Sequence, residues 1–327
     1  MSVTMKDLAK YTGLSLGTIS NYINGKVPVS EEKGERIEKA IKELGYEINI
    51  VAKTLKTKSF NCIGVLIPSF SYQFMIQLIK HIELILADYN YNFMVLSYND
   101  NVDCLYKQLK YLTQRTDGIL CVPLPEMDLN VFKEIKNVPV ITFDEATKEV
   151  IGDRVLVNNT QIVEEAIDCI IKQGHTKIGF VAGRSRDYTT MQRRIGYETA
   201  LMNNSIPILE KNILFGTYEK KSGYDCCKQL LEQNPEITAI LVVGYRMTLG
   251  VLAAIKELKQ ENIVDVIGYD AIDIADIVNV KFGYVYQPYR EIAKELVELI
   301  MKRVNGDYSD FPKTVIVKAE IRNGPVN

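Results

Sequence analysis

The alternation of strand-like and helix-like segments from residue 62 onward constrains the fold more than any other feature. Short runs rich in β-branched residues, such as CIGVLI at 62–67, alternate with longer amphipathic stretches. Such repetition predicts parallel sheets covered by helices on both faces. The repeats are too numerous for one sheet of ordinary size, which indicates two lobes. The expected strands are 62–67, 92–97, 118–122, 138–142, 177–181, 212–215, 238–243 and 264–268, and the expected helices are 73–89, 102–114, 128–136, 160–173, 188–203, 222–233 and 247–260.

The first sixty residues lack this alternation and predict three short helices with tight connections. Thr4 and Asp7 form a capping-box pattern before the first helix, and Gly13 ends it. Ser15 and Ser30 are placed to cap the second and third helices. A small core is expected from Leu8, Ala9, Leu14, Ile19, Ile23, Val29, Ile37, Ala40, Ile41 and Leu44.

Composition narrows the class of protein. Hydrophobic residues make up 47% and charged residues 24% of the 327 residues, an ordinary globular balance. No apolar run approaches the ~20 residues of a membrane span, and the opening MSVTMKD lacks the apolar core of a secretion signal. We therefore expect a cytoplasmic protein without a membrane partner.

Cysteine and histidine usage argues against a metal, a cofactor or an enzyme. The six cysteines include no CxxC pair, and the only histidines are His81 and His175. No glycine-rich nucleotide loop, P-loop or nucleophile elbow stands in a strand–turn–helix context. A cytosolic α/β enzyme remains as an alternative, without a site to support it.

Residues 3–25 fit a helix-turn-helix, in which the second helix enters the major groove of DNA. Leu16, Gly17 and Asn21 would then face base edges. The short polar residues suited to phosphate contacts are Thr4, Ser15, Thr18 and Asn24. The alternative is a three-helix bundle used for protein contact, which does not explain why the second helix exposes small polar residues. Residues 1–60 hold ten Lys/Arg and seven Asp/Glu, so charge alone is a weak argument for nucleic acid.

This head closely resembles that of the lactose-repressor/galactose-repressor family of bacterial transcription regulators. The stretch VTMKDLAKYTGLSLGTISNYIN at 3–24 matches nearly every fixed position of the family pattern. Landmarks continue along the chain at GVLIP (64–68), GH (174–175), GYD (268–270) and QP (287–288). The resemblance implies a sequence-specific DNA-binding regulator, and we expect a repressor.

The head also departs from the family pattern. Asn21 stands where the family commonly has arginine, and Leu16-Gly17 stands where it has a polar pair. Asparagine can pair with adenine, whereas arginine favours guanine, and leucine can contact a thymine methyl. Gly34 replaces a residue that is often basic. We therefore expect an operator that differs from the family's usual one.

For the linker at 47–60, the resemblance implies a hinge helix that forms on DNA around 49–56. Leu55 would wedge into the minor groove, and Ala52 and Lys56 would lie at neighbouring contact positions. Ile48 stands where proline is frequent, so the start of this helix is less well defined. The alternative is a simple tether.

For the body, the resemblance implies a two-lobed α/β fold like that of periplasmic sugar-binding proteins (type I), with a ligand in the cleft. The expected domains are a head at 1–46, a hinge at 47–60 and a body at 61–327. The chain would cross between lobes near residues 158, 286 and 311. The first lobe would hold 61–157 and 287–310, and the second lobe 159–285 and 312–327.

The residues that match effector contacts in the family each follow an expected strand, where ligands of parallel sheets bind. These positions are Phe74, Arg193, Tyr218 and Asp270, with Asp144 and Gln287 as weaker candidates. The alternatives are an Arg193–Asp270 salt bridge across an empty cleft and core packing for Phe74. Tyr245 is a further candidate for effector contact, but it is a departure, because the family usually has Asn or Asp near it.

The loop GRSRD at 183–187 is unusually basic. Arg184 and Arg186 could pair with a phosphate, which would suit a phosphorylated sugar, or could form a solvated charged loop. The overall expectation is a homodimer or a tetramer on a palindromic double-stranded operator, controlled by a sugar or phosphorylated sugar. A sugar-binding protein with a helical head that does not bind DNA is the other alternative.

Overall fold

The computed structural model describes residues 3–24, 27–46, 59–147, 149–150, 152–270 and 281–323. The chain divides into two compact units, 1–59 and 60–327, which are considered separately. The predicted hinge contacts Ala52, Leu55 and Lys56 lie outside the described residues.

The head unit holds three helices, α1 (Met5–Thr12), α2 (Leu16–Asn24) and α3 (Glu31–Leu44). The Thr4 hydroxyl accepts the Asp7 N–H, and the Asp7 carboxylate accepts the Thr4 N–H at 2.9 Å, which confirms the capping box. Ser15 caps α2 as expected, because its Oγ accepts the Thr18 N–H at 3.1 Å. Ser30 is the N-cap residue of α3, but the expected cap by its side chain is wrong, because that side chain makes no cap hydrogen bond. Its backbone carbonyl accepts the Gly34 N–H. The buried core is Leu8, Ile19, Ile37, Ala40 and Tyr46.

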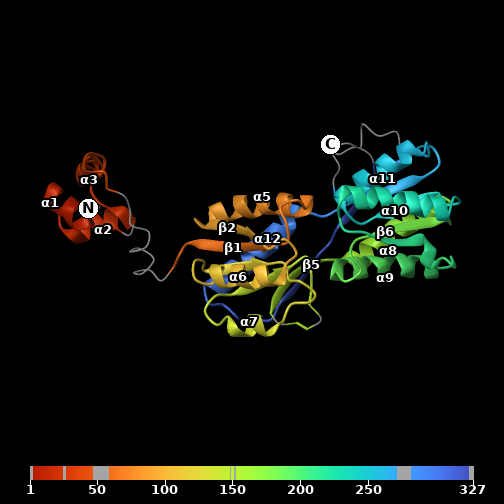
Figure 1. The fold of residues 1–327 in the computed structure, drawn as a ribbon. Coiled ribbons are helices and arrows are strands. Elements are labelled where there is room, and N and C mark those ends of the chain that lie inside the picture. The colour runs from red at the N-terminus through yellow and green to blue at the C-terminus, as the bar shows by residue number, and fades with distance from the viewer. Residues whose placement is uncertain are drawn as a thin grey trace. The chain divides into compact units, whose positions relative to one another are not determined.

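The first lobe of the body is a six-stranded parallel sheet in the order β11-β5-β4-β3-β1-β2. Its strands are β1 (Cys62–Ile67), β2 (Asn92–Ser97), β3 (Gly118–Cys121), β4 (Val140–Phe143), β5 (Asp153–Val157) and β11 (Thr314–Val317). Helices α5 (Gln73–Asp88) and α12 (Tyr289–Val304) pack together on one face, and α6 (Val102–Leu112) covers the other. The short helix α7 (Asn130–Glu134) precedes β4 (Figure 1).

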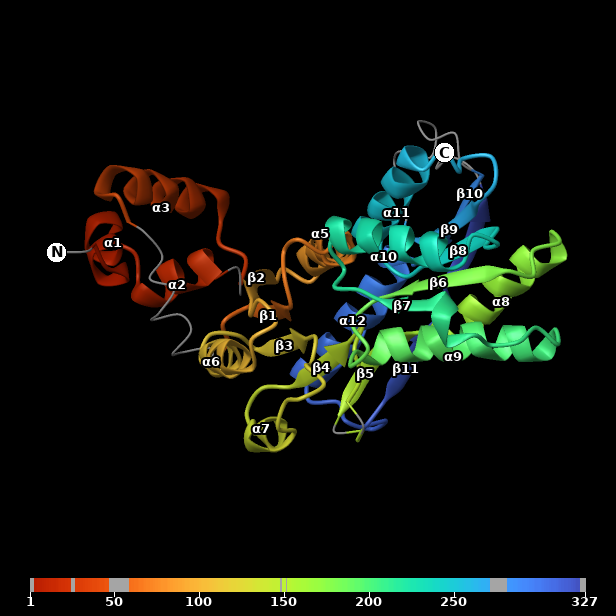
Figure 2. The same ribbon diagram turned by 45° about the vertical axis from the view of Figure 1, so that its right-hand side comes forward.

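The second lobe repeats this plan with the order β12-β10-β9-β8-β6-β7, in which only the β12 pairing is antiparallel. Its strands are β6 (Ile178–Ala182), β7 (Ile213–Phe215), β8 (Ala239–Val242), β9 (Asp265–Tyr269), β10 (Phe282–Tyr286) and β12 (Glu320–Asn323). Helices α8 (Asn159–Lys172) and α9 (Tyr188–Asn203) lie on one face, and α10 (Lys220–Gln233) and α11 (Tyr245–Glu257) on the other (Figures 1 and 2). A 3₁₀ turn, Glu210–Asn212, precedes β7.

The fold class predicted from the sequence is confirmed: a helical head is followed by two α/β lobes built on parallel sheets. Strand β1 shows why the sequences of the central strands are continuous apolar runs. Ile63, Val65 and Ile67 belong to the core that α5 and α12 cover, whereas Leu66 belongs to the core under α6. Both faces of the strand are therefore buried.

The chain passes between the lobes at Asn158, at 287–288 and at 318–319. The expectation of a last crossing near residue 311 is wrong, because Thr314–Val317 pairs in parallel with β5 before the chain leaves the first lobe. Two crossings are tied together. Asn158 donates its N–H to the Val317 carbonyl at 3.1 Å and accepts the Ala319 N–H on its side-chain oxygen at 2.8 Å.

Within the described part of the chain, no helix combines the length and apolar character that a bilayer crossing demands.

Candidate functional site

The start of α2 presents the surface that the helix-turn-helix prediction needs. Ser15, Leu16 and Gly17 are exposed, and 46% of the Leu16 surface is accessible although the side chain is apolar. One turn on, Ile19 is fully buried and anchors the helix to the head core. Asn21 is half-buried, one helical turn beyond Gly17 on the same face. The N-terminal turn of α2 is thus anchored to the head core on one side and exposed on the other.

The polar residues predicted to contact phosphates are partly engaged within the head. The Thr4 hydroxyl is 2.7 Å from the Asp7 carboxylate, and the Ser15 and Thr18 hydroxyls are 2.9 Å apart. Thr4 and Ser15 are exposed, so both can also be reached from outside. Asn24 is the last residue of α2.

A pocket lies between the lobes of the body, at the carboxyl ends of strands from both sheets, and encloses about 90 Å³. It brings together every residue that the sequence singled out for effector contact. These are Phe74, Asp144, Arg193, Tyr218, Tyr245, Asp270 and Gln287. Their part in binding stays a prediction, but their convergence from seven separate segments of sequence is a property of the fold.

Three of these residues have a backbone conformation that residues other than glycine rarely adopt. Asp144, Tyr218 and Asp270 have φ angles of 63°, 64° and 66°, in the left-handed region. Each directly follows, or lies a few residues beyond, a strand end. For residues other than glycine such conformations cost on the order of 1 kcal/mol or more and cluster at ligand sites. The turns that carry these three side chains are therefore strained.

The Arg193 guanidinium lies almost fully buried in the wall of the pocket. Its Nε donates to the Asn159 side-chain oxygen at 2.8 Å, and its Nη1 donates to the Val243 carbonyl at 3.0 Å. Its Cζ stands 3.9 Å above the Tyr269 ring, where the charge is stabilised by the ring face. Arg193 is held by neutral groups.

Asp270 is 4% exposed, and its carboxylate is oriented by one residue at the crossing between the lobes and one at the start of α12. One oxygen, Oδ1, accepts from Gln287 Nε2 at 2.8 Å and from the Tyr289 hydroxyl at 3.1 Å. The ion pairs found among the described residues do not include an Arg193–Asp270 pair, so the expected alternative of a salt bridge across the cleft is not observed.

Aromatic rings form the rest of the pocket. Phe74 packs on the core of the first lobe, with its ring centroid 5.9 Å from that of Tyr289, and it also lines the pocket, so its contact with an effector stays a prediction. The Tyr218 hydroxyl and the Thr190 Oγ1 are 2.7 Å apart. A Cβ built on Gly183 would lie 2.2 Å from the Tyr218 ring, so only glycine lets this ring occupy its place.

The carboxyl groups of the pocket share one electrostatic trend. Burial, together with the neighbouring Glu145 charge, raises the pKa of the Asp144 carboxyl well above its usual range. Burial likewise raises the pKa of Glu145, Asp187 and Asp270. The site therefore holds more acidic groups than its surroundings can fully stabilise as anions.

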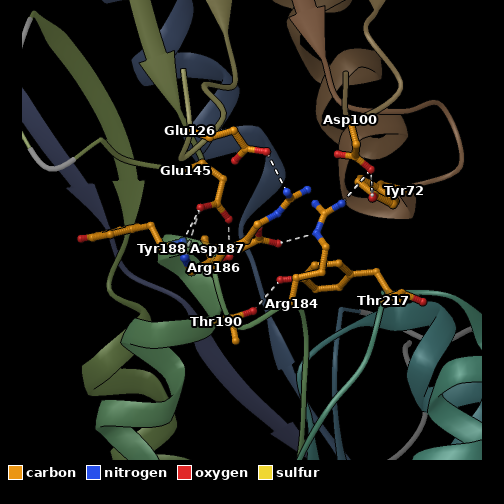
Figure 3. Close-up of polar contacts among 12 residues, drawn as sticks. Tyr72, Asp100, Glu126, Glu145, Arg184, Arg186, Asp187, Tyr188, Thr190 and Thr217 are labelled. Atoms are coloured by element: carbon orange, nitrogen blue, oxygen red, sulfur yellow. Dashed lines mark hydrogen bonds and ion pairs between the residues drawn. The ribbon is translucent and has the colours of Figure 1, made fainter. Parts of the chain in front are cut away.

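The basic loop after β6 reaches across to the first lobe (Figure 3). Arg184 Nη1 pairs with the Asp100 carboxylate at 2.7 Å, and Arg186 Nη1 pairs with Glu126 at 2.7 Å. Asp100 and Glu126 follow strands β2 and β3 of the first lobe. Both guanidiniums are bound to carboxylates of the facing lobe, which neither expectation for this loop included. Pairing of the loop with a phosphate stays a prediction.

A third link runs in the opposite direction. Glu145, after β4 of the first lobe, accepts the Tyr188 N–H at 2.7 Å and the Thr189 hydroxyl at the start of α9 in the second lobe. Figure 3 shows Glu145 pointing onto this helix end. We refer to the Arg184–Asp100, Arg186–Glu126 and Glu145–α9 contacts as the interlobe clasp.

The sequence reading missed several residues of the pocket wall, namely Tyr72, Glu145, Asp187, Thr189 and Arg246. Each lies within a few positions of a residue that was singled out or of the basic loop. What these residues share in the sequence is a position soon after a strand. Every loop on this side of the sheets has the same property, so it does not single them out.

Comparisons with known proteins agree with this architecture. Residues 61–305 match the family described as periplasmic binding proteins and sugar binding domain of LacI family, and residues 4–49 match bacterial regulatory proteins, lacI family. Catabolite control protein A of Priestia megaterium is 29% identical over 316 residues, 95% of each chain. The transcriptional repressor PurR of Yersinia pestis is 29% identical over 97% of this chain and 95% of its own. A lac repressor dimer bound to operator and the anti-inducer ONPF superposes with a TM-score of 0.88 at 23% identity, covering 99% and 98% of the two chains.

Proposed function

The chain belongs to the LacI family of bacterial DNA-binding transcription regulators, and from this premise we propose that it is a repressor controlled by a small polyhydroxylated effector in the interlobe pocket. Members of this family are regulators and not enzymes, which answers the enzyme alternative. The helical head matches the DNA-binding part of the family, which answers the alternative of a head without DNA contact. Acting on DNA, the protein would work in the cytoplasm.

The observation that carries the effector proposal is the concentration of hydrogen-bonding side chains in one buried pocket. Asp270, Gln287 and Arg193 are each no more than 5% exposed, yet all three line the cavity. Buried polar groups are costly unless they are satisfied, and sugar hydroxyls can satisfy both acceptors and donors. The rings of Phe74 and Tyr218 offer flat apolar faces to the C–H groups of a sugar ring.

The size of the pocket favours a small effector. The pocket encloses about 90 Å³, which favours a single small molecule over a chain of sugars.

DNA recognition is proposed to occur through the exposed start of α2. Leu16, Gly17 and Asn21 would face base edges, and the polar residues around them would contact phosphates. Two heads of a homodimer, or of a tetramer built from dimers, would read the halves of a palindromic operator. The hinge residues Ala52, Leu55 and Lys56 would complete the interface in the minor groove.

Control by the effector requires a difference in affinity between two arrangements of the lobes. The pocket is built from both lobes, since Phe74 and Asp144 come from the first and Arg193, Tyr218 and Asp270 from the second. A ligand that touches both sides stabilises one particular spacing of the lobes. The change in spacing would then be passed to the DNA-binding units of the dimer.

A paired experiment tests this function. Retention on duplex DNA is measured against salt concentration, and free and phosphorylated sugars are screened for a rise in melting temperature of the full chain. We expect DNA retention to fall steeply with salt, and an active sugar to change it. Asp270→Asn should abolish the rise in melting temperature, whereas Glu232→Gln, at the exposed far end of α10, should not. A monomeric protein that ignores every duplex at low salt would overturn the proposal.

A further inference from the structure

The charges around the pocket are unevenly matched. Its wall contains the carboxyl groups of Asp144, Glu145, Asp187 and Asp270 and the guanidinium groups of Arg184, Arg193 and Arg246. The guanidiniums also serve carboxylates outside the wall, because Arg184 pairs with Asp100 and Arg246 pairs with Glu219, each at 2.7 Å. With Asp100 and Glu219 added to the four carboxyl groups of the wall, the acidic groups outnumber the three guanidiniums by two to one.

The interlobe clasp uses the arginines that could otherwise bind an anion. Arg184 holds Asp100 and, through Nε at 2.9 Å, Asp187, and Arg186 holds Glu126. A phosphate that bound to either guanidinium would share it with a carboxylate that is already paired there. That carboxylate would then face the phosphate as a like charge, which disfavours an anionic ligand.

Two carboxyl groups of the pocket have no cation of their own. In the part of the chain that the structure describes, neither Asp144 nor Asp270 belongs to an ion pair, and the Asp144 carboxyl makes no hydrogen bond through its side chain. The nearby guanidinium, Arg193, is committed to Asn159 and Val243. The charges of Asp144 and Asp270 are close enough that Asp270 contributes to the raised pKa of Asp144.

An unpartnered acceptor belongs to a residue of the pocket wall. Gln287 is 2% exposed, and its Oε1 has no hydrogen-bond donor among the described residues, although its Nε2 donates to Asp270. An orphaned acceptor of this kind calls for a donor from a ligand. The pocket thus leaves acceptors and negative charge without partners.

Aromatic faces add to this preference. Tyr72, Phe74, Tyr218 and Tyr245 all line the pocket, and the electron-rich face of an aromatic ring attracts cations.

We infer that the effector is a hydroxylated organic cation, an amino sugar, whose ammonium group binds between the carboxylates of Asp144 and Asp270, and that phosphorylated sugars are excluded. This inference rests on the proposed function and narrows it to one class of ligand. The hydroxyl groups would donate to Gln287 Oε1, and the ring would lie against the aromatic wall. An ammonium group has donors only, which matches a pocket with unpartnered acceptors.

Binding of a cation should also release a proton. The ligand-free Asp144 carboxyl holds its proton more tightly than usual because of burial and the acidic neighbours Glu145, Asp270 and Asp187, with Arg193 acting in the opposite sense. A bound ammonium group favours the charged carboxylate and lowers this pKa, so the proton leaves. A neutral sugar has no such effect.

The test uses matched sets of sugars with the full chain. For the gluco, galacto and manno series, the amino sugar, its N-acetyl form, the neutral hexose and the hexose 6-phosphate are compared by calorimetry at neutral pH in two buffers of different ionisation enthalpy. We expect one amino sugar to bind about tenfold or more tightly than its neutral and phosphorylated counterparts, the scale of one charge-assisted hydrogen bond. Its binding should release a proton.

Variants assign the effect to the site. Asp144→Asn keeps the shape of the side chain and should remove both the tenfold preference and the proton release, whereas the exposed carboxylate change Glu232→Gln should leave both intact. Equal or tighter binding of a neutral or phosphorylated member overturns the inference, and so does the failure of every amino sugar to bind. If such a competitor binds and alters DNA retention, the inference fails while the proposed regulator function stands.

Discussion

The Glu145 carboxylate accepts a 2.7 Å hydrogen bond from the backbone N–H of Tyr188, although the two residues belong to different lobes. Tyr188 is the first residue of α9, and the N-cap residue of that helix, Asp187, makes no side-chain cap hydrogen bond. The first N–H groups of a helix have no partner within the helix and carry its positive dipole end. Glu145 therefore caps a helix of the facing lobe and links the two lobes.

Glu145→Ala should loosen the start of α9. The loss of a helix cap costs about 1 kcal/mol, so the amides of Tyr188 and Thr189 should exchange with solvent roughly fivefold faster. Hydrogen exchange of the ligand-free protein measures this directly. Glu126→Ala is the matched control, because it removes the partly exposed clasp contact with Arg186 and leaves the cap in place. Unchanged exchange in the Glu145 variant would show that the cap does not hold α9.

Gly183→Ala should impair effector binding through Tyr218. The added Cβ would lie 2.2 Å from the ring, so the ring or the loop must move, at a cost of about 1–3 kcal/mol. We expect a lower melting temperature and at least tenfold weaker effector binding. Gly152→Ala is the control, because its Cβ would meet only ordinary contacts at 3.9 Å. Wild-type affinity in the Gly183 variant would mean that Tyr218 is not needed where it lies.

The parts of the fold that could be predicted are those that depend on residues close together in the sequence. The apolar run of β1 and the capping box of Thr4 and Asp7 follow from neighbouring residues, and both are confirmed. The pocket residues could be named because parallel strands bring their carboxyl ends to one edge, so Asp144 and Asp270 meet although they are distant in sequence. Resemblance to a known family then selected among the many loop residues at that edge.

The clasp could not be predicted in the same way. Arg184 and Arg186 are conspicuous in sequence, but their partners Asp100 and Glu126 are ordinary acidic residues whose approach depends on how the lobes face each other. The last crossing was misplaced for a similar reason. The short run Thr314–Val317 suits the edge of either sheet, and only the packed fold decides for β5.

Asn21→Ala tests the reading of DNA. The side chain lies on the exposed face of α2, so the change should alter base preference at one symmetric pair of operator positions by about 1–3 kcal/mol. Binding to unrelated duplexes should change little, because phosphate contacts dominate it. Selection of bound sequences from a random pool measures the preference, with Asn203→Ala in α9 as a control outside the head. An identical selected sequence would remove Asn21 from the reading surface.

Arg303 anchors α12 to the edge of the first lobe. Its side chain is fully buried, and it grips Asp153 with two hydrogen bonds of 2.6 and 3.1 Å while pairing with Asp310 at 2.8 Å. Arg303→Met leaves the buried Asp153 carboxylate without its cation, so we expect the free energy of unfolding to fall by about 3–5 kcal/mol. Urea denaturation of the full chain measures the loss.

The neighbouring lysine provides the comparison for Arg303. Lys302 also pairs with Asp310, at 2.9 Å, but its side chain is 31% exposed, so Lys302→Met should cost less than about 1 kcal/mol. A loss of similar size in both variants would contradict a special role for the buried pair.

Asp144 should make the ligand-free protein less stable as the pH rises. Its pKa in the folded protein is raised by burial above the ordinary 3.8, so the folded state binds a proton that the unfolded state has released. Stability from this group is therefore fully present below pH 3.8 and is lost as the pH rises through the higher folded value. Asp144→Asn cannot ionise, so its advantage in melting temperature over the wild type should grow from acid to mildly alkaline pH. A constant difference across that range would show that Asp144 ionises as freely in the folded pocket as in the unfolded chain. The pocket would then gain nothing from a positive charge beside Asp144.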